Sequence, residues 1–364
     1  MTRTWSRWLP AAVAPVVVAA SVAAASHAGA AADLPDRSPE EVLAMIGERE
    51  VDAFSGSFEQ TADLGLPDLP AGPAGRAADA PDAAGAADVL AALTGSHSGR
   101  VFVGGPTTAR VQVMDSFAER DVVRNGDEVW VYDSRDNVAT LLTLPAGHAA
   151  PDHGQGDAPT PEEVADHLVA ALEPSTDLTV GEDATVAGRA AYELVMTPRT
   201  AETLVGSVAI AVDGDTGLPL AVTVRARAQQ DPAFEIAYTS LDVGAPDAGL
   251  FEFVPPPGAT VVEKTLQGHT DQAHTDEGRT DPGAASPAGG AEPTVVGSGW
   301  EAVLVIPAGA AHPATTGGPM LELTTGVEGG RLLSTALVNG LLADDGRVLV
   351  GSVPLERLQA AAAP

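Results

Sequence analysis

The chain has 364 residues, with 50 Asp and Glu against 19 Lys and Arg, which gives a formal net charge of -31 at pH 7. A field this negative repels nucleic acid and anionic membrane surfaces, so nucleic-acid binding is excluded as a function. The absence of Cys excludes disulfides, a lipid-anchoring cysteine, thiol catalysis and thiolate metal sites. Because 45% of the residues are hydrophobic but only 4% are aromatic, Val, Leu and Ala must pack most of the core.

Residues 1–32 have the three-part form of a secretory signal. Arg3 and Arg7 precede an apolar run from residue 9 to residue 25, and small residues at 28–30 follow it. The sequence therefore predicts an exported, extracytoplasmic protein whose signal peptide is cleaved. The alternative is an uncleaved membrane anchor, because the run approaches the roughly 18 residues that span a bilayer. Prolines within the run favour cleavage.

Two later segments carry the signals of a helix start, with a hydroxyl residue at the N-cap, proline at the first helical position and Glu completing a capping box. They are Ser38 to Glu41 and Thr160 to Glu163. Apolar residues at helical spacing follow each start. These are Val42, Leu43 and Ile46 in the first helix, and Val164, Leu168 and Leu172 in the second. The second helix ends before Pro174 and is the candidate lid of a binding site.

Alternating apolar and polar residues predict strands over most of the remaining chain. The clearest pair is a hairpin in which strands 128–133 and 138–144 flank a polar turn, directly after an Asn125-Gly126 turn pair. Short turns between strands indicate an antiparallel meander. The predicted strands are 54–61, 100–103, 109–115, 117–124, 128–133, 138–144, 179–186, 190–197, 206–212, 221–228 and 234–241.

Three segments together carry a family resemblance: Phe54 to Thr61, the hairpin Asn125 to Pro145 (NGDEVWVYDSRDNVATLLTLP), and Phe251 to Pro257. In this order they resemble the LolA family of periplasmic lipoprotein carriers and its relative RseB. The resemblance implies a mainly β (α+β) fold, an open antiparallel half-barrel with a helical lid, spanning residues 33–262. Lys264 is the only lysine of the chain, and so low a lysine content is typical of proteins from GC-rich genomes. An actinobacterial source is therefore expected, and with it a resemblance to an actinobacterial type of LolA protein.

The C-terminal third changes character twice. Residues 263–293 are rich in His, Thr, Asp, Gly and Pro, cannot bury a core and are predicted to be a disordered linker. Apolar runs then resume at 300–306, 332–342 and 347–353, with a turn predicted at 344–346. A small C-terminal β-unit, or α/β unit, is therefore predicted at 294–364. The Ala-, Gly- and Pro-rich segment 63–87 is predicted to be a loop, followed by a short helix at 88–93.

No motif indicates an enzyme, a cofactor or a metal. HExxH, Walker A and dinucleotide fingerprints are absent, and Gly95 to Gly99 has His97 where a nucleophile elbow has Ser, so a bend before a strand is the favoured interpretation. Three groups of His and Asp have side chains that could ligate a metal, but no metal site is predicted, because a spacer, a loop and a hairpin turn explain them. The groups are His269, Asp271, His274 and Asp276; His148, Asp152, His153 and Asp157; and Asp213 with Asp215.

An open half-barrel sends alternate side chains of each strand inward, so one face can line an apolar cavity. The alternative is that the same residues merely fill a core. The hairpin sequence does not determine which face points inward, because both faces are apolar: Val129 and Val131 share one face, and Trp130 and Tyr132 share the other. The predicted cavity residues are Phe58, Val111, Val113, Val129, Val131, Leu142 and Leu168.

The leading functional hypothesis is an exported, non-enzymatic carrier or sensor that holds lipid or lipoprotein acyl chains in the half-barrel. The resemblance to RseB implies an alternative, a regulatory protein that acts on a membrane-bound anti-sigma factor through its C-terminal unit. A secreted hydrolase is disfavoured by the absence of motifs. No cofactor is expected, and the expected partners are acyl chains and a membrane-bound protein.

Overall fold

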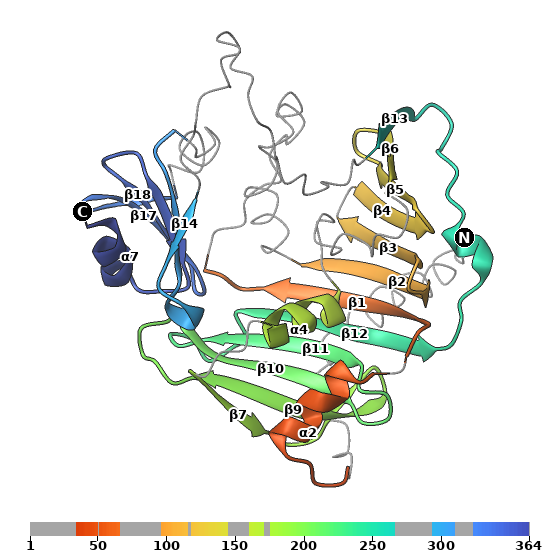
Figure 1. Cartoon of the computed structure of the whole chain (residues 1–364), viewed down its shortest axis with the longest axis horizontal. Coiled ribbons are helices and arrows are strands. Elements are labelled where there is room, and N and C mark those ends of the chain that lie inside the picture. The colour runs from red at the N-terminus through yellow and green to blue at the C-terminus, as the bar shows by residue number, and fades with distance from the viewer. Residues whose placement is uncertain are drawn as a thin grey trace, which may run out of the picture.

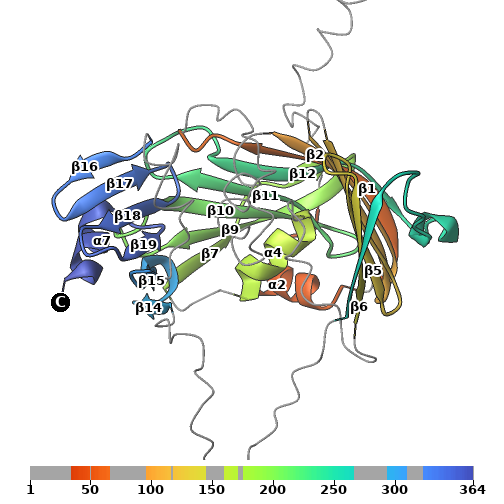
Figure 2. The same cartoon turned by 90° about the horizontal axis from the view of Figure 1, so that it is seen from above.

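The computed structural model describes residues 34–49, 51–65, 96–115, 118–144, 160–170, 175–265, 293–309 and 323–363. Two β-sheets build this part of the chain (Figures 1 and 2). The strands of the larger sheet are β1 (Phe54–Ala62), β2 (His97–Gly105), β3 (Thr108–Asp115), β4 (Ala118–Asn125), β5 (Glu128–Asp133), β6 (Val138–Thr143), β7 (Thr176–Val180), β8 (Ala184–Val186), β9 (Arg189–Pro198), β10 (Val205–Asp213), β11 (Pro219–Ala226), β12 (Phe234–Val243) and β13 (Thr260–Thr265).

The larger sheet is a curved half-barrel. Its 13 strands follow the order β13-β6-β5-β4-β3-β2-β1-β12-β11-β10-β9-β7, with β8 paired to β9. In Figure 1, β2 to β6 rise as a wall from a floor that β9 to β12 form. The mainly β half-barrel predicted from the sequence is thereby confirmed. One detail differs, because β13 runs parallel to β6 and makes the sheet mixed rather than purely antiparallel.

Two helices lie on the concave side of the floor. Helix α2 (Pro39–Gly47) begins with the predicted capping box, in which Ser38 Oγ accepts from Glu41 N–H and Glu41 Oε2 accepts from Ser38 N–H. Its buried Val42 and Ile46 pack toward β7, β9 and β10. Helix α4 (Pro161–Ala170) packs on β11 and β12. Both predicted helices are therefore confirmed, and together they cover the floor but not the wall (Figure 2).

The boundaries of the sheet differ from the prediction in two places. The predicted strand 179–186 is two strands, β7 and β8, which pair with different parts of β9. Positive φ at Ala187 and Gly188 makes the turn that joins β8 to β9. Strand β13, which was not predicted, continues through Thr265, so the predicted linker start at Glu263 lies inside a strand. Its parallel pairing with β6 gives these residues backbone partners far away in sequence, such as Leu142 opposite Lys264.

The smaller sheet forms the C-terminal unit. Its order is β14-β15-β19-β18-β17-β16, six strands that are all antiparallel. The predicted run 332–342 is broken into two strands by a turn in which Thr335 Oγ1 donates to the carbonyl of Val338. Helix α7, whose position was not predicted, covers one face. The bounds are β14 (Thr294–Val296), β15 (Val303–Ile306), β16 (Thr325–Val327), β17 (Gly330–Ser334), β18 (Asn339–Ala343), β19 (Val348–Gly351) and α7 (Leu355–Ala362).

Specific contacts fix the C-terminal unit to the end of the half-barrel floor. Trp300, in the short helix η3 (Gly299–Glu301), packs on the main core and donates its indole N–H to Thr176 Oγ1 at 2.8 Å. The carbonyl of Ser352 accepts from the backbone N–H of Leu204 at 2.8 Å, and Ala336 N–H donates to the carbonyl of Leu64 at 2.9 Å. The unit therefore has a defined orientation relative to the larger sheet.

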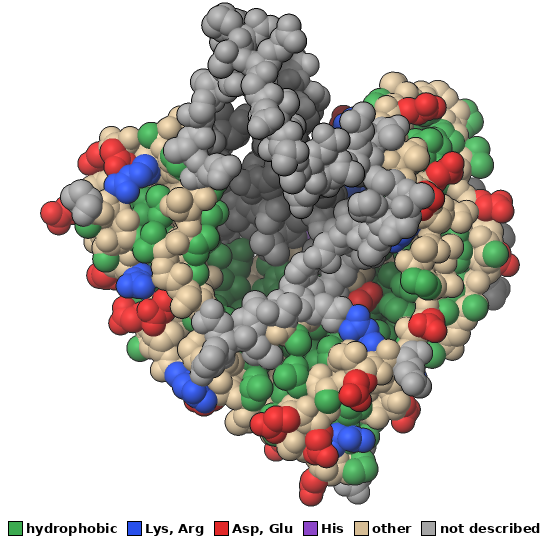
Figure 3. Space-filling model, in the orientation of Figure 1, with side chains coloured by type: hydrophobic (Ala, Val, Ile, Leu, Met, Phe, Trp, Pro, Cys, Tyr) green, Lys and Arg blue, Asp and Glu red, His purple; other side chains and the backbone are tan. Residues whose placement is uncertain are grey.

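In the space-filling view the molecule is hollowed between the C-terminal unit and the wall (Figure 3). Figure 3 shows hydrophobic side chains on the C-terminal unit, on the floor and on the wall where these parts border the hollow. The signal segment, most of the loop 63–87, the predicted helix 88–93 and most of the linker lie outside the described residues. Among the described helices, none has the length and apolar character needed to cross a membrane.

Candidate ligand-binding surface

The strand register brings most of the predicted cavity residues onto one face of the sheet. Cα pairing places Val111 opposite Val122, and Val122 opposite Val131. Val129 lies opposite Leu142 on the next strand. Since directly paired residues and residues two apart on a strand point to the same side, one face carries the predicted residues of β3, β5 and β6.

Phe58 places this face on the concave side. It pairs through Gly99 with Val113, so it shares the face with the valines. On its other side it pairs with Tyr238 of β12, whose ring meets Phe58 edge to face at a centroid distance of 6.4 Å. The Tyr238 hydroxyl donates to Glu162 Oε2 of α4 at 2.5 Å. The valine face is therefore the face on which α4 lies.

The opposite face of the hairpin is covered from outside. Phe253 packs against Trp130 and Tyr132 at ring centroid distances of 5.3 and 5.9 Å. Nearby, the short helix η2 (Ala248–Phe251) is held to the wall by Arg110, which donates to the carbonyl of Leu250. The two aromatic side chains of the hairpin thus lie on the convex side, which leaves Val129 and Val131 to the concave side.

Arg110 is held by an ion pair with Asp121 on the same convex side. The side chain of Asp121 is almost fully buried, and Arg110 Nε donates to its Oδ1 at 3.0 Å. Burial raises the pKa of Asp121 above its usual value, although the hydrogen bond and charge of Arg110 act in the opposite direction. The pair therefore serves to fasten η2 to the wall, and it faces away from the concave surface.

The predicted residues differ in accessibility. Phe58 is only 1% exposed and is enclosed by Tyr238 and by Gly99, where a Cβ would lie 2.4 Å from Phe58 Cζ. It is part of the core, the alternative that the sequence left open for each residue. The remaining described members are half-buried, so part of each faces the hollow; they are Val111, Val113, Val129, Val131 and Leu142. Leu168 lies on α4, but its side chain is outside the described part of the chain.

Replacing Phe58 tests whether this residue contributes to stability rather than to acyl-chain binding. Replacing Phe58 with Leu removes the edge-to-face contact with Tyr238 and is expected to lower the free energy of unfolding by about 1–2 kcal/mol. Acyl-chain affinity is expected to change less than about twofold, which is about 0.4 kcal/mol. Urea unfolding and a lipid-binding titration on the same sample measure both. A large loss of affinity in a folded variant would instead return Phe58 to the binding surface.

Sequence reasoning missed several half-buried residues of this surface, among them Val122 on β4, Val138 on β6 and Val262 on β13. Val122 fills the position between Val111 and Val131, and Val138 lies opposite Asp133. The period-two rule applied to strand 117–124 could have found Val122, because it is aligned with predicted residues on both neighbouring strands.

Four described charged groups share the concave face with the valines: Arg120, Arg124, Asp133 and Lys264. Arg124, opposite Val129, is buried and donates to the carbonyls of Gly126 and Pro106. Arg120 and Asp133 are directly opposite on β4 and β5, with 2.9 Å between Nη2 and Oδ2. Burial opposes ionisation of Asp133, but hydrogen bonds from Arg120 and from the backbone N–H groups of Arg135 and Asp136 hold its pKa below the usual value. The pair is neutral as a whole, so the row from Val111 through Val122 to Val131 stays apolar.

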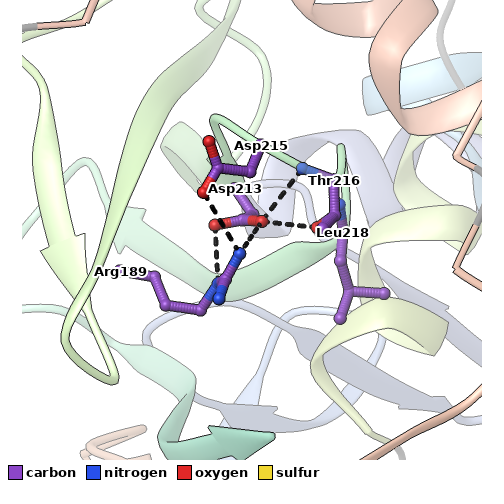
Figure 4. Close-up of polar contacts among 5 residues, drawn as sticks. All are labelled: Arg189, Asp213, Asp215, Thr216 and Leu218. Atoms are coloured by element: carbon purple, nitrogen blue, oxygen red, sulfur yellow. Dashed lines mark hydrogen bonds and ion pairs between the residues drawn. The ribbon is translucent and has the colours of Figure 1, made fainter. Parts of the chain in front are cut away.

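The turn between β10 and β11 is a structural turn and not a calcium loop. The carboxylate of Asp213 is 1% exposed and accepts from Arg189 Nε and Nη2 at 2.8 and 2.7 Å (Figure 4). It also accepts from Thr216 N–H and Oγ1–H. These bonds use the oxygens that a cation would need. The hydrogen bonds between Arg189 and Asp213 raise the pKa of Arg189. The prediction of a hairpin turn is confirmed.

The other polar groups weighed in the sequence do not converge on the concave surface. His97 is the first residue of β2 rather than part of a bend before it. The groups around His148 and His269 lie outside the described residues, within which no three His, Asp or Glu side chains gather as metal ligands. A cavity of about 490 Å³ lies on the C-terminal unit, where Arg347 donates to Asp345 and to the carbonyl of Ala362. None of the predicted residues lines it.

Neither a protein-family model nor a curated protein sequence matches the chain. Among solved structures, the chain is similar to the MucA/MucB complex of Pseudomonas aeruginosa, with 16% identity and a TM-score of 0.42 over 89% of this chain and 96% of that chain. A structure of MucB alone gives 17% identity and a TM-score of 0.40 over 88% and 94% of the two chains. A LolA superfamily protein from Nitrosomonas europaea gives 11% identity and a TM-score of 0.25 over 60% and 99%. The chain is thus similar in fold to MucB and to LolA superfamily proteins, and the sequence predicts a resemblance to the LolA family.

Proposed function

We propose that the protein is an exported, non-enzymatic binding protein that holds the acyl chains of a lipid or lipoprotein against the concave face of its half-barrel. The observation that carries this proposal is the row of half-buried valines on that face, which α4 and α2 leave uncovered on the wall side. Carrier and sensor are both compatible with such a surface, and the occupant is the same in each.

The chemistry of the surface favours an aliphatic occupant. Val111, Val122 and Val131 present branched apolar side chains, and the charges of Arg120 and Asp133 beside them neutralise each other. Arg124, opposite Val129, is buried and donates to the carbonyls of Gly126 and Pro106. A methylene group that moves from water onto such a surface contributes up to about 0.8 kcal/mol when it is fully buried. An acyl chain of ordinary length therefore gains enough to bind without any directional polar contact.

Helix α4 supports the same proposal. It is fastened to the floor by the hydrogen bond between Tyr238 and Glu162, and it lies beside the apolar wall rather than over it. An acyl chain on the valine row would therefore extend from the helix along the wall. Helix α4 therefore borders the proposed site and does not lie over it, unlike the lid expected for the second predicted helix.

Native mass spectrometry of the secreted protein tests the proposal. After incubation with lipid extract, the protein is expected to carry one or more acyl-containing adducts, which dissociate on organic extraction. The absence of any adduct across lipid and lipopeptide mixtures would overturn the proposal. Recovery of the ligand with its ester and amide bonds intact is expected of a binding protein, whereas a cleaved ligand would indicate a hydrolase.

A second candidate function is regulation through a membrane-bound protein partner. The observation that favours it is the edge strand β14, where Val295 and Val296 are 64% and 42% exposed. An exposed apolar edge can accept a strand from another chain. Replacing Val296 with Lys is expected to reduce capture of a membrane protein from the envelope of the source cell. Equal capture by both proteins would count against this candidate.

A further inference from the structure

One face of the C-terminal sheet is covered by none of the helices that the structure describes. Helix α7 packs Leu355 and Leu358 on the opposite face, together with Val305, Leu341 and Leu349. On the uncovered face, strand pairing aligns a row of apolar side chains across β14, β15, β19, β18 and β17. The row consists of Val295, Leu304, Val350, Gly340 and Leu333.

A second apolar row lies beside the first. Pairing places Ile306 opposite Val348, and Val348 opposite Leu342. Within the described part of the chain, none of these side chains belongs to a hydrophobic core cluster. Leu304 is 39% exposed although it lies in an interior strand. The second row ends at Arg331 on β17. An apolar sheet face whose side chains join no core of the described residues is typical of a binding surface.

The uncovered face is directed at the half-barrel. In Figures 1 and 2, α7 lies on the side of the C-terminal sheet away from the larger sheet, so the other side of the C-terminal sheet is turned toward the larger sheet. The contacts of Trp300, Ser352 and Ala336 hold the unit in this orientation. The uncovered face of the C-terminal sheet and the concave face of the half-barrel therefore border the same hollow.

We propose that the uncovered face of the C-terminal sheet is the second apolar wall of the acyl-chain site, and that the ligand is a lipid with two acyl chains, one against each sheet. This inference rests on the function proposed above. A chain on a single apolar face keeps its other side in water, and a second wall removes that exposure. Two walls presented by separate sheets match a ligand whose two chains diverge from one headgroup.

Single cysteines can report on the two walls separately, because the natural chain has none. An environment-sensitive fluorophore is attached at Leu304→Cys on the C-terminal wall, at Val138→Cys on the half-barrel wall, and at Val254→Cys as a control. Val254 is 80% exposed and follows Phe253 on the convex side. The ligand probe is dimyristoylphosphatidylcholine, a zwitterionic lipid that the net charge of -31 does not repel.

We expect the lipid to shift fluorophore emission to the blue at both Leu304→Cys and Val138→Cys and to leave Val254→Cys unchanged. A shift at Val138→Cys alone would contradict the proposal that the C-terminal sheet is a second wall, and the proposed function would stand. The absence of a shift at either wall would overturn the proposed function itself.

A binding titration gives an independent measurement. The double variant Leu304→Ser with Val350→Ser is expected to weaken affinity for dimyristoylphosphatidylcholine on the order of tenfold and to leave affinity for myristic acid unchanged, since one chain still has the half-barrel wall. Val296→Ser, on the other face of edge strand β14, is the matched control and is expected to bind both probes normally. Equal losses for both probes, or none, would contradict a separate wall for the second chain.

Discussion

Replacing Val131 with Asp is expected to abolish acyl-chain capture. Val131 lies in the middle of the concave row, opposite Val122 on one side and Thr140 on the other. A carboxylate there has no cation directly opposite it, and an acyl chain laid over it would remove its hydration. We expect affinity to fall at least about a hundredfold, roughly 3 kcal/mol, measured by titration with a fluorescent fatty acid.

Two further Val-to-Asp variants calibrate this result. Val113 lies directly opposite Arg120, whose guanidinium can pair with a new carboxylate, so Val113→Asp is expected to lose less affinity than Val131→Asp. Val261 on β13 is 47% exposed and lies on the convex face, opposite Ala139, so Val261→Asp is expected to bind normally. Normal binding by a folded Val131→Asp protein would place the acyl chain elsewhere.

The hairpin from Asn125 to Pro145 shows how far local sequence could predict the binding surface. Its two strands and its turn are where the pattern placed them, because alternation and turn chemistry act over a few residues. The direction of its faces was not predictable from the hairpin alone. It depends on Phe253, which comes more than a hundred residues later and covers Trp130 and Tyr132 from outside.

Long-range pairing also explains the elements that sequence reasoning missed. Strand β13 has only six residues, two of them charged, and its partner β6 lies far upstream and runs parallel to it. Phe58 alternates like its neighbours on β1, yet Tyr238 across the strand and Gly99 beside it enclose it completely. Period-two patterning identifies which residues share a face, whereas the depth of burial depends on partners that no local window contains.

The sequence also could not predict which face of the C-terminal sheet is uncovered. Its apolar runs predicted strands correctly, and a strand with apolar residues on both faces is usually buried on both. Helix α7 accounts for one face only. The sequence shows that Leu304 and Val350 are apolar but not which way they face. Only the position of α7 on the opposite face shows that they are outside the core of their own unit.

Replacing Asp213 with Ala is expected to cause the largest loss of stability among these variants. The substitution leaves Arg189, whose side chain is 24% exposed, without its bidentate partner, and it removes the acceptor of Thr216 N–H. Breaking a buried ion pair costs about 3 kcal/mol or more, which corresponds to a fall in Tm on the order of 10 °C for a domain of this size. Thermal unfolding followed by circular dichroism measures it.

The effect should extend to α2, because the same turn supports that helix. Gly217 has φ of 73° and approaches so closely that a Cβ would lie 2.3 Å from the carbonyl oxygen of Met45 in α2. A disordered turn therefore loosens the helix that covers the floor of the half-barrel, and hydrogen exchange in α2 is expected to accelerate together with exchange in β10 and β11. The control is Asp215→Asn, since the Asp215 side chain is 88% exposed and lies 3.6 Å from Arg189; its effect should stay within about 0.5 kcal/mol. Equal stability of Asp213→Ala and Asp215→Asn would show that the buried carboxylate does not hold the turn.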